Sequence, residues 1–197
     1  EGKITATVTK RNVTLTSGDG SKAYDGSALK NETVTVGGDG FVKDEGATCS
    51  NFASITNQGK TPNEFEYKLN EGTLAGNYNI EKKYGTLVIT NSETKLTFAE
   101  GSPQGYNGMY DGDAHDALTD LTVIGIDGEE FVYSKDNNSN MKVEYKVGDN
   151  WTTDVQQVTN VEDSKDIEIR VTVPNYDPLE GKITATVTKR NVTLTSG

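Results

Sequence analysis

The strongest constraint on the fold of this chain is a segment of 18 residues that occurs twice. The sequence EGKITATVTKRNVTLTSG spans residues 1–18 and recurs unchanged over residues 180–197, an offset of 179 positions (180 minus 1). Self-similarity at a fixed spacing is typical of repeat proteins, in which each repeat is a structural unit joined to its neighbours. We therefore expect the chain to be one period of a longer array.

Apolar and β-branched residues alternate with polar residues along much of the chain. The alternation is clearest over residues 4–8, 65–69, 143–147 and 167–173. A period of two residues is typical of half-buried strands. The intervening segments, such as VGGDGF and KDNNSN, are rich in the Gly, Asp and Asn that turns require. The sequence therefore predicts an all-β fold.

Two short motifs divide the chain into similar halves. The motif YDG occurs at residues 24–26 and 110–112, and the motif NY occurs at residues 77–78 and 175–176. In each half YDG comes first, several expected strands follow, and NY precedes a final strand. Each half therefore has the pattern of one module.

The parity of the apolar positions locates the joints between modules. Ile4 and Val8 occupy even positions, whereas Val13 and Leu15 occupy odd positions, so a single straight strand would expose one of the two pairs. We expect residues 1–10 to be the closing strand of a preceding module and residues 190–197 to be the opening strand of a following one. The two complete modules are then residues 11–91 and 92–189. Residues 3–9 and 191–195 should be extended tails without partners in this chain.

The predicted architecture is two tandem antiparallel β modules, each an immunoglobulin-like sandwich. A ubiquitin-like β-grasp is the alternative. It requires a helix across its sheet, and only residues 27–30 and 113–118 could form one. Both segments are short, so the sandwich is favoured.

Charge and composition limit the partners. The chain has 19 Lys and Arg against 30 Asp and Glu, and its net charge of −11 disfavours binding to nucleic acid or anionic membranes. No segment approaches the roughly 18 apolar residues of a membrane helix, so we expect no membrane insertion. A single cysteine, Cys49, excludes an internal disulfide.

No pattern in the sequence indicates catalysis. The only histidine, His115, lies in the segment DGDAHDAL, and nucleophile, phosphate-binding and zinc motifs are absent. Asp136, Asn138 and Asn140 alternate as in a calcium loop, but the glycine and the closing glutamate of that loop are missing. We expect no enzyme activity, no catalytic residue, no metal and no cofactor.

Cys49 has two interpretations. With a glutamine such as Gln58 it could form a thioester, of the kind found in bacterial surface proteins. A lone cysteine is more often a small buried apolar residue, and we favour that interpretation.

Aromatic residues of the second module offer one candidate binding site. Tyr106, Tyr110, Tyr133 and Trp151 could form a platform for stacking on sugars. In the structural alternative, Trp151 fills a sandwich core, while Tyr24 and Tyr110 are corner tyrosines that bond to the backbone. The recurrence of this tyrosine in both modules favours a structural role.

The order of these motifs resembles a known family. YDG is followed by a strand such as NETVTV or TDLTVIG, then by NY in AGNYNI or PNYDP, and then by a Thr-rich strand such as GTLVIT or GKITATVTK. This order resembles the YDG and MBG types of repeat in large bacterial cell-surface proteins, and it covers nearly the whole chain. The resemblance implies an extracellular location, either cell-wall anchored or secreted, with neighbouring repeats as partners.

Together these features predict a non-catalytic structural stalk or spacer of a bacterial surface adhesin that projects a distal functional domain. Two alternatives remain. The chain could be an adhesin module that itself binds host glycan or mucin, or an accessory module of a large secreted glycosidase.

Overall fold

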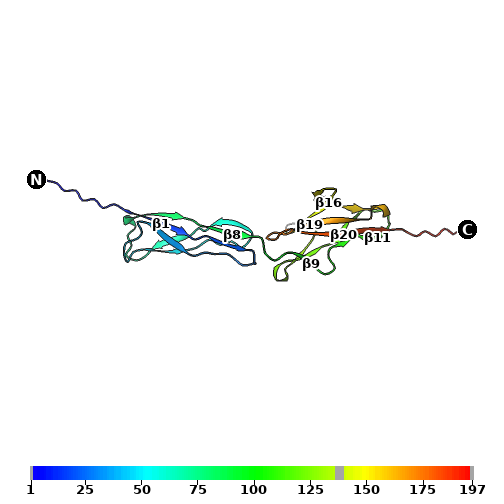
Figure 1. Ribbon diagram of the computed structural model, residues 1–197, viewed down its shortest axis with the longest axis horizontal. Coiled ribbons are helices and arrows are strands. Elements are labelled where there is room, and N and C mark those ends of the chain that lie inside the picture. The colour runs from blue at the N-terminus through cyan, green and yellow to red at the C-terminus, as the bar shows by residue number, and fades with distance from the viewer. Residues whose placement is uncertain (1, 136–139, 196–197) are drawn as a thin grey trace. The chain divides into compact units, whose positions relative to one another are not determined.

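The computed structural model describes residues 2–135 and 140–195 and divides the chain into two compact units. Unit 1 is Glu1–Thr90 and unit 2 is Asn91–Gly197 (Figure 1). The sequence placed the boundary between residues 91 and 92, one position further along the chain. Each unit has its own sheets and its own core, and each is described separately.

Unit 1 consists of short strands in three sheets, ordered β3-β1-β7, β2-β8-β5 and β4-β6. Its strands are β1 Arg11–Ser17, β2 Gly20–Ala23, β3 Val34–Gly38, β4 Ala47–Ser50, β5 Gly59–Pro62, β6 Glu66–Leu69, β7 Tyr78–Lys83 and β8 Thr86–Thr90.

The first and last strands of unit 1 run parallel along the whole unit. β1 pairs with β7, with Arg11 opposite Tyr78, and β2 continues the pairing with β8, with Ala23 opposite Thr90. Arg11 and Tyr78 begin their strands, whereas Ala23 and Thr90 end theirs. The chain therefore enters unit 1 at one end and leaves it at the other.

Alternate side chains of β1 form the core of unit 1. Val13 and Leu15 pack with Phe65 and Tyr78, and a second group of half-buried apolar residues surrounds them. Burying a side chain of this size contributes about 1.5–3 kcal/mol. The odd positions of the opening strand therefore face the interior.

A buried polar cluster fixes the bend between β1 and β2. The side-chain amide of Asn63 donates to the carbonyls of Gly18 (2.9 Å) and Asn31 (2.7 Å), and Ser17 Oγ donates to the carbonyl of Asn63 (2.6 Å). A Cβ at Gly85 would lie 2.6 Å from the backbone of Gly18. The two parallel segments approach so closely here that Gly85 is required.

Unit 2 contains twelve strands in the described residues, and its largest sheet has the order β11-β20-β19-β16-β17. Its strands are β9 Thr97–Phe98, β10 Gln104–Gly105, β11 Asn107–Met109, β12 His115–Asp116, β13 Leu118–Asp120, β14 Thr122–Ile124, β15 Glu130–Val132, β16 Lys142–Val147, β17 Asn150–Thr152, β18 Gln157–Val158, β19 Lys165–Thr172 and β20 Leu179–Thr188.

β20 connects the two ends of unit 2. It pairs antiparallel with β19 and parallel with β11. The N–H of Ser92, at the start of the unit, donates to the carbonyl of Asn175 (2.8 Å), just before β20 begins. Because β20 ends at Thr188, the chain again enters at one end of the unit and leaves at the other.

The prediction of an all-β chain built from two tandem sandwiches is confirmed, with one correction. The predicted modules were antiparallel, but β1–β7, β2–β8 and β11–β20 are parallel pairs. β1 and β2 run in the same direction as β7 and β8, and β11 runs in the same direction as β20, so none of these pairs is antiparallel.

The β-grasp alternative is wrong. Within the described residues the helical segments are three short 3-10 turns: η1 Ala75–Asn77, η2 Ile126–Gly128 and η3 Val161–Asp163. The segment 27–30 instead forms an isolated bridge from Leu29 to Ile55, and residues 113–118 contain β12.

The repeated segment adopts two different environments. In β20, Ile183 is 2% exposed, whereas the equivalent Ile4 is 94% exposed. In the second half of each 18-residue copy the exposure is reversed, because Leu15 is 1% exposed and the equivalent Leu194 is 92% exposed. The described tail residues 2–10 and 189–195 lie outside all strands. Each copy is therefore half folded into a unit and half exposed.

The two copies allow a matched mutational test. We expect Ile183→Ala to destabilise unit 2 by about 2–5 kcal/mol, because it removes buried methyl groups and leaves a cavity. Ile4→Ala lies in an identical sequence but should leave stability unchanged, since Ile4 is 94% exposed. Urea unfolding followed by far-ultraviolet circular dichroism, which reports on the strands of both units, measures both effects. Equal effects of the two variants would contradict the burial of Ile183 and the exposure of Ile4.

Candidate functional site

The backbone of the YDG motif closes the exit end of each unit. The N–H of Tyr24 donates to the carbonyl of Thr90 (3.0 Å), and the N–H of Tyr110 donates to the carbonyl of Thr188 (2.9 Å). Thr90 and Thr188 are the final residues of β8 and β20. The same motif therefore makes the same contact with the last strand in both units.

The Asp and Gly of the motif build the turn that follows. Asp25 Oδ1 accepts the N–H of Ser27 (2.9 Å), and Asp111 Oδ1 accepts the N–H of Asp113 (3.0 Å). This bond, from an Asp side chain to the backbone two residues later, is an Asx turn. Gly112 has φ +95°, a conformation that favours glycine.

A basic side chain accompanies the aspartate in each unit, but its type differs. Lys22 Nζ lies 2.6 Å from Asp25 Oδ1 in unit 1, and His115 Nε2 lies 3.0 Å from Asp111 Oδ2 in unit 2. The hydrogen bond from Lys22 is the main cause that lowers the pKa of Asp25. The backbone N–H of Asp113, followed by His115, lowers the pKa of Asp111. The only histidine therefore supports a turn.

The NY motif supplies a buried tyrosine near the entry end of each unit. Tyr78 Oη accepts the N–H of Val42 (3.2 Å), and Tyr176 Oη accepts the N–H of Ile126 (3.0 Å). Both tyrosines are at most 5% exposed. A tyrosine hydroxyl bonded to distant backbone in this way has the role of the tyrosine corner of immunoglobulin-like domains. The corner tyrosines expected from the sequence, Tyr24 and Tyr110, belong to the other paired motif, and the paired NY motif is the signal from which Tyr78 and Tyr176 could have been found.

The joint residues are bound to loops of unit 1 at its entry end. The guanidinium of Arg11 donates to the carbonyls of Gly40 (3.0 Å, from Nε) and Asp39. The N–H of Asn12 donates to Asp39 Oδ2 (2.9 Å). The first residues of β1 are therefore held by charge-assisted bonds as well as by strand pairing.

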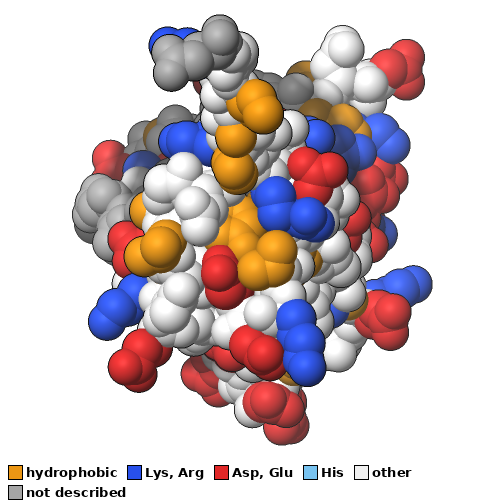
Figure 2. Space-filling view, turned by 90° about the vertical axis from the view of Figure 1, so that its left-hand side faces the viewer, with side chains coloured by type: hydrophobic (Ala, Val, Ile, Leu, Met, Phe, Trp, Pro, Cys, Tyr) orange, Lys and Arg blue, Asp and Glu red, His pale blue; other side chains and the backbone are white. Residues whose placement is uncertain are grey.

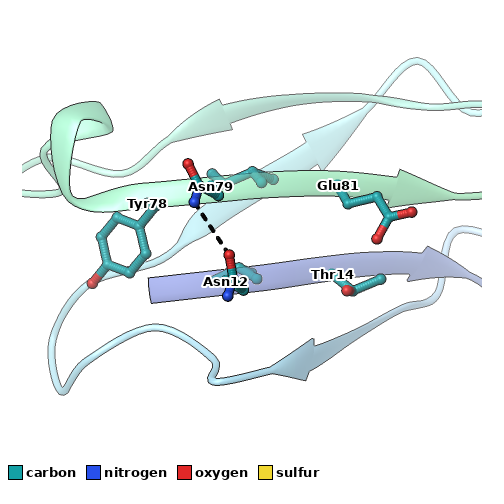
Figure 3. A pocket seen from close by; sticks show the side chains of 7 residues that line it. Asn12, Thr14, Tyr78, Asn79 and Glu81 are labelled. Carbon is teal, nitrogen blue, oxygen red and sulfur yellow. Dashed lines mark hydrogen bonds between the residues drawn. The ribbon is translucent and has the colours of Figure 1, made fainter. Parts of the chain in front are cut away.

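An open groove of about 480 Å³ lies beside this joint, over β1 and β7 (Figure 3). Asn12 and Thr14 contribute from β1, and Asn79 and Glu81 contribute from β7. The amide of Asn79 donates to Asn12 Oδ1 (3.2 Å) across the groove. Amide, hydroxyl and carboxylate groups of this kind can bond to sugar hydroxyls. No sequence pattern indicated the groove, since β1 and β7 lie far apart along the chain.

Trp151 is not part of the core. It lies opposite Lys146 in the β16–β17 pair, whereas the neighbouring Tyr145 faces the interior and is 1% exposed. The guanidinium carbon of Arg170 is 4.1 Å from the centre of the Trp151 ring, and the same guanidinium donates to Glu180 (2.8 Å). The expectation that Trp151 fills the sandwich core is therefore wrong, because strand register places it on the outer face of the sheet.

The four aromatic residues of the predicted platform lie in different places. Tyr110 follows β11 at one edge of the five-stranded sheet, and Trp151 is on β17 at the other edge. Four strand spacings separate these edges, roughly 19 Å. Tyr106 stacks on His115, with 4.2 Å between ring centres. Tyr133 lies beside Tyr145, whose pKa is raised mainly by burial.

The described residues hold no group of three or more His, Cys, Asp or Glu side chains arranged to bind a metal ion. Asp136 and Asn138 of the rejected calcium loop lie outside the described residues. Among the described helical turns, none is long and apolar enough to cross a membrane.

Cys49 lies at the margin of the unit 1 core. It is opposite Tyr67 in the β4–β6 pair, and burial raises the pKa of its thiol. Gln58 immediately precedes β5, which belongs to a different sheet. Cys49 therefore packs as an apolar residue in this structure.

Comparisons with known proteins place few constraints on this chain. No family model matches the sequence, and no curated protein matches it. Among solved structures, mouse cadherin-23 EC22-24 aligns with 94% of this chain and 66% of its own, at 14% identity and a TM-score of 0.35. DIP-gamma IG1+IG2 aligns with 88% of this chain and 94% of its own, at 6% identity and a TM-score of 0.32. The fold assignment rests on the strand pairing and cores described above.

The corner role of Tyr176 can be tested by removing one oxygen atom. Tyr176→Phe leaves the N–H of Ile126 without its acceptor, so unit 2 should lose about 1–3 kcal/mol of stability. The control Tyr110→Phe alters a side chain that is 40% exposed and should change stability by less than about 0.5 kcal/mol. Thermal unfolding measures both, and a wild-type midpoint for Tyr176→Phe would exclude the role.

The Asp111 turn predicts a pH dependence. A carboxyl whose pKa is lowered by folding stabilises the protein above its unfolded pKa of about 3.9, and this stability disappears as the pH falls through the folded pKa. Asp111→Asn should therefore reduce the loss of unit 2 stability on acidification from about pH 5 to pH 2. The control is Asp120→Asn, on the exposed end of β13. Denaturation at a series of pH values measures how steeply the free energy of unfolding changes with pH. The same pH dependence in Asp111→Asn as in the wild type would contradict this account.

Proposed function

We propose that this chain is a non-catalytic structural stalk or spacer repeat of a bacterial surface adhesin, of the YDG and MBG type. One observation carries the proposal. In unit 1 the first two strands pair in parallel with the last two, and in unit 2 β11 pairs in parallel with the last strand, β20, so the chain enters at one end of each unit and leaves at the other. A molecule built from such units can be lengthened by adding further units, which is what a spacer requires.

The recurring motifs support a structural role. The YDG and NY motifs make their hydrogen bonds within their own unit, to the last strand and to an internal loop. The two halves share these residues because each unit needs the same internal hydrogen bonds. A common ligand is not required to explain the recurrence. We accordingly place the protein outside the cell, cell-wall anchored or secreted, with neighbouring repeats as its partners and no cofactor.

The strand lengths give the expected extension. β20 has ten residues, which corresponds to roughly 33 Å at the usual rise of a strand. A period of two such units would add roughly 60 Å. A stalk of several periods would hold a distal functional domain well away from the cell wall.

Length can be measured directly. Chains with one, two and three copies of the 179-residue period should show a maximum dimension, by small-angle X-ray scattering, that increases by roughly 60 Å for each copy. The increase follows from entry and exit at opposite ends. Copies that collapse together, without a regular increment, would exclude a spacer.

A second candidate function is glycan or mucin binding at the groove over β1 and β7. It is favoured by the polar side chains of Asn12, Asn79 and Glu81, which line an open groove. A glycan array tests it with the wild type, with Asn79→Ala and with Tyr110→Ala, which changes the tyrosine of the aromatic platform. Under the spacer proposal no glycan binds. Binding that Asn79→Ala removes while the fold is retained would establish the second candidate.

An accessory module of a secreted glycosidase would share the spacer role and differ only in the domain that the repeats carry. The flanking sequence distinguishes these two versions, because a catalytic domain beside the repeats would identify the glycosidase.

A further inference from the structure

The exposed N-terminal segment has a known folded form elsewhere in the same chain. Residues 3–9 repeat residues 182–188 of β20. Within β20 this sequence buries Ile183, Ala185 and Val187, each at most 3% exposed. At the N-terminus Ile4 and Val8 are at least 94% exposed. The same strand is therefore paired in one copy and unpaired in the other.

We propose that residues 3–9 are the last strand of a module of the unit 2 type that belongs to a second copy of this sequence, placed directly before this one. The inference rests on the proposed function, since it requires the chain to be one period of an array. It goes further because it names the module to which the exposed strand belongs and the end of unit 1 that this module covers.

The contacts of β20 specify how residues 3–9 would be bound. In unit 2 the N–H of Thr186 donates to the carbonyl of Tyr106 (2.7 Å), and the N–H of Val187 donates to Ser164 Oγ (2.9 Å). The residues equivalent to Thr186 and Val187 are Thr7 and Val8. These two amides should therefore be hydrogen bonded when a preceding module is present, and exposed to water when it is absent.

The short joint would bring the preceding module against unit 1. β20 ends at Thr188, equivalent to Thr9, and β1 begins at Arg11, so Lys10 alone lies between the two strands. A connection of one residue allows little separation between the modules that it joins. The entry end of unit 1 should therefore be covered by the exit end of the preceding module.

Apolar side chains are exposed at both of these ends. At the entry end, Val42 is 41% exposed and Leu74 is 65% exposed, in the two loops that flank Tyr78. Figure 2 views the molecule from the side of this end, with the N-terminal tail towards the viewer, and shows hydrophobic side chains near the centre with Lys and Arg side chains beside them. At the exit end of unit 2, Met109 is 53% exposed beside Thr188. Burial of these side chains against one another would stabilise the joint.

The proposal can be tested by adding the missing module. Residues 91–179 are fused directly before residue 1, which recreates the natural sequence at the joint because residues 1–18 repeat residues 180–197. Hydrogen exchange is then compared with that of the original chain. The amides of Thr7 and Val8 should exchange roughly 100-fold or more slowly in the fused chain, since local protection follows the stability of the folded unit. Equal exchange rates in the two chains would overturn the proposal.

A substitution in the strand provides the control. Ile4→Asp in the fused chain should remove the protection of Thr7 and Val8 and unfold the added module, because it buries an unpaired charge. The same substitution in the original chain should leave its unfolding unchanged. If Ile4→Asp has no effect in the fused chain, residues 3–9 are not the last strand of the added module.

A matched pair of variants tests whether the entry end of unit 1 is covered by the preceding module. Leu74→Asp should lower the denaturant midpoint of the added module in the fused chain, whereas Val36→Asp, at a position of the edge strand β3 that is 53% exposed, should not. Equal midpoints for these two variants would overturn the contact with the entry end. Protection of residues 3–9 without a regular increase in length would support this inference and exclude the spacer function. A regular increase in length without protection of residues 3–9 would support the spacer function and overturn this inference.

Discussion

The parallel pairing of an early strand with a late strand underlies both units. In unit 1, β1 and β2 run beside β7 and β8 from the entry end to the exit end, and in unit 2, β11 runs beside β20. An antiparallel pair would return the chain to the end at which it entered. Parallel pairing instead places the entry and the exit of the chain at opposite ends of each unit. The positions of the motifs and the proposed spacer role both follow from this arrangement.

The two short motifs stabilise opposite ends of this arrangement. NY lies at the entry end, where the hydroxyl of its tyrosine accepts a backbone N–H from a distant loop. YDG lies at the exit end, where its backbone and its aspartate join the turn to the last strand. Both motifs satisfy backbone groups of turns, loops and strand ends, and a hydrogen bond of this kind contributes about 0.5–1.5 kcal/mol. They recur because every unit has the same two ends.

Some features could be predicted because they depend on local pattern. Alternation predicted the β class and the buried faces of β1, β16, β19 and β20, and two tandem modules followed from the repeated motifs. The direction of strand pairing could not be predicted, since alternation has the same period in parallel and antiparallel sheets. Trp151 was placed in the core because large aromatic residues usually bury there. The register of β17 against β16 puts it beneath Arg170 instead, and a register set by tertiary pairing leaves no local signal.

The sequence by itself determined where strands can form, which of their faces can be buried and where the joints between modules lie. The two identical copies show what it left undetermined. Leu15 is buried while Leu194 is exposed, and Ile183 is buried while Ile4 is exposed, although their neighbouring residues are the same. A strand of this length has no stable conformation alone, because its backbone groups and apolar side chains need neighbouring strands. The tertiary structure therefore decided which half of each copy folds, since the chain provides partner strands for one half only.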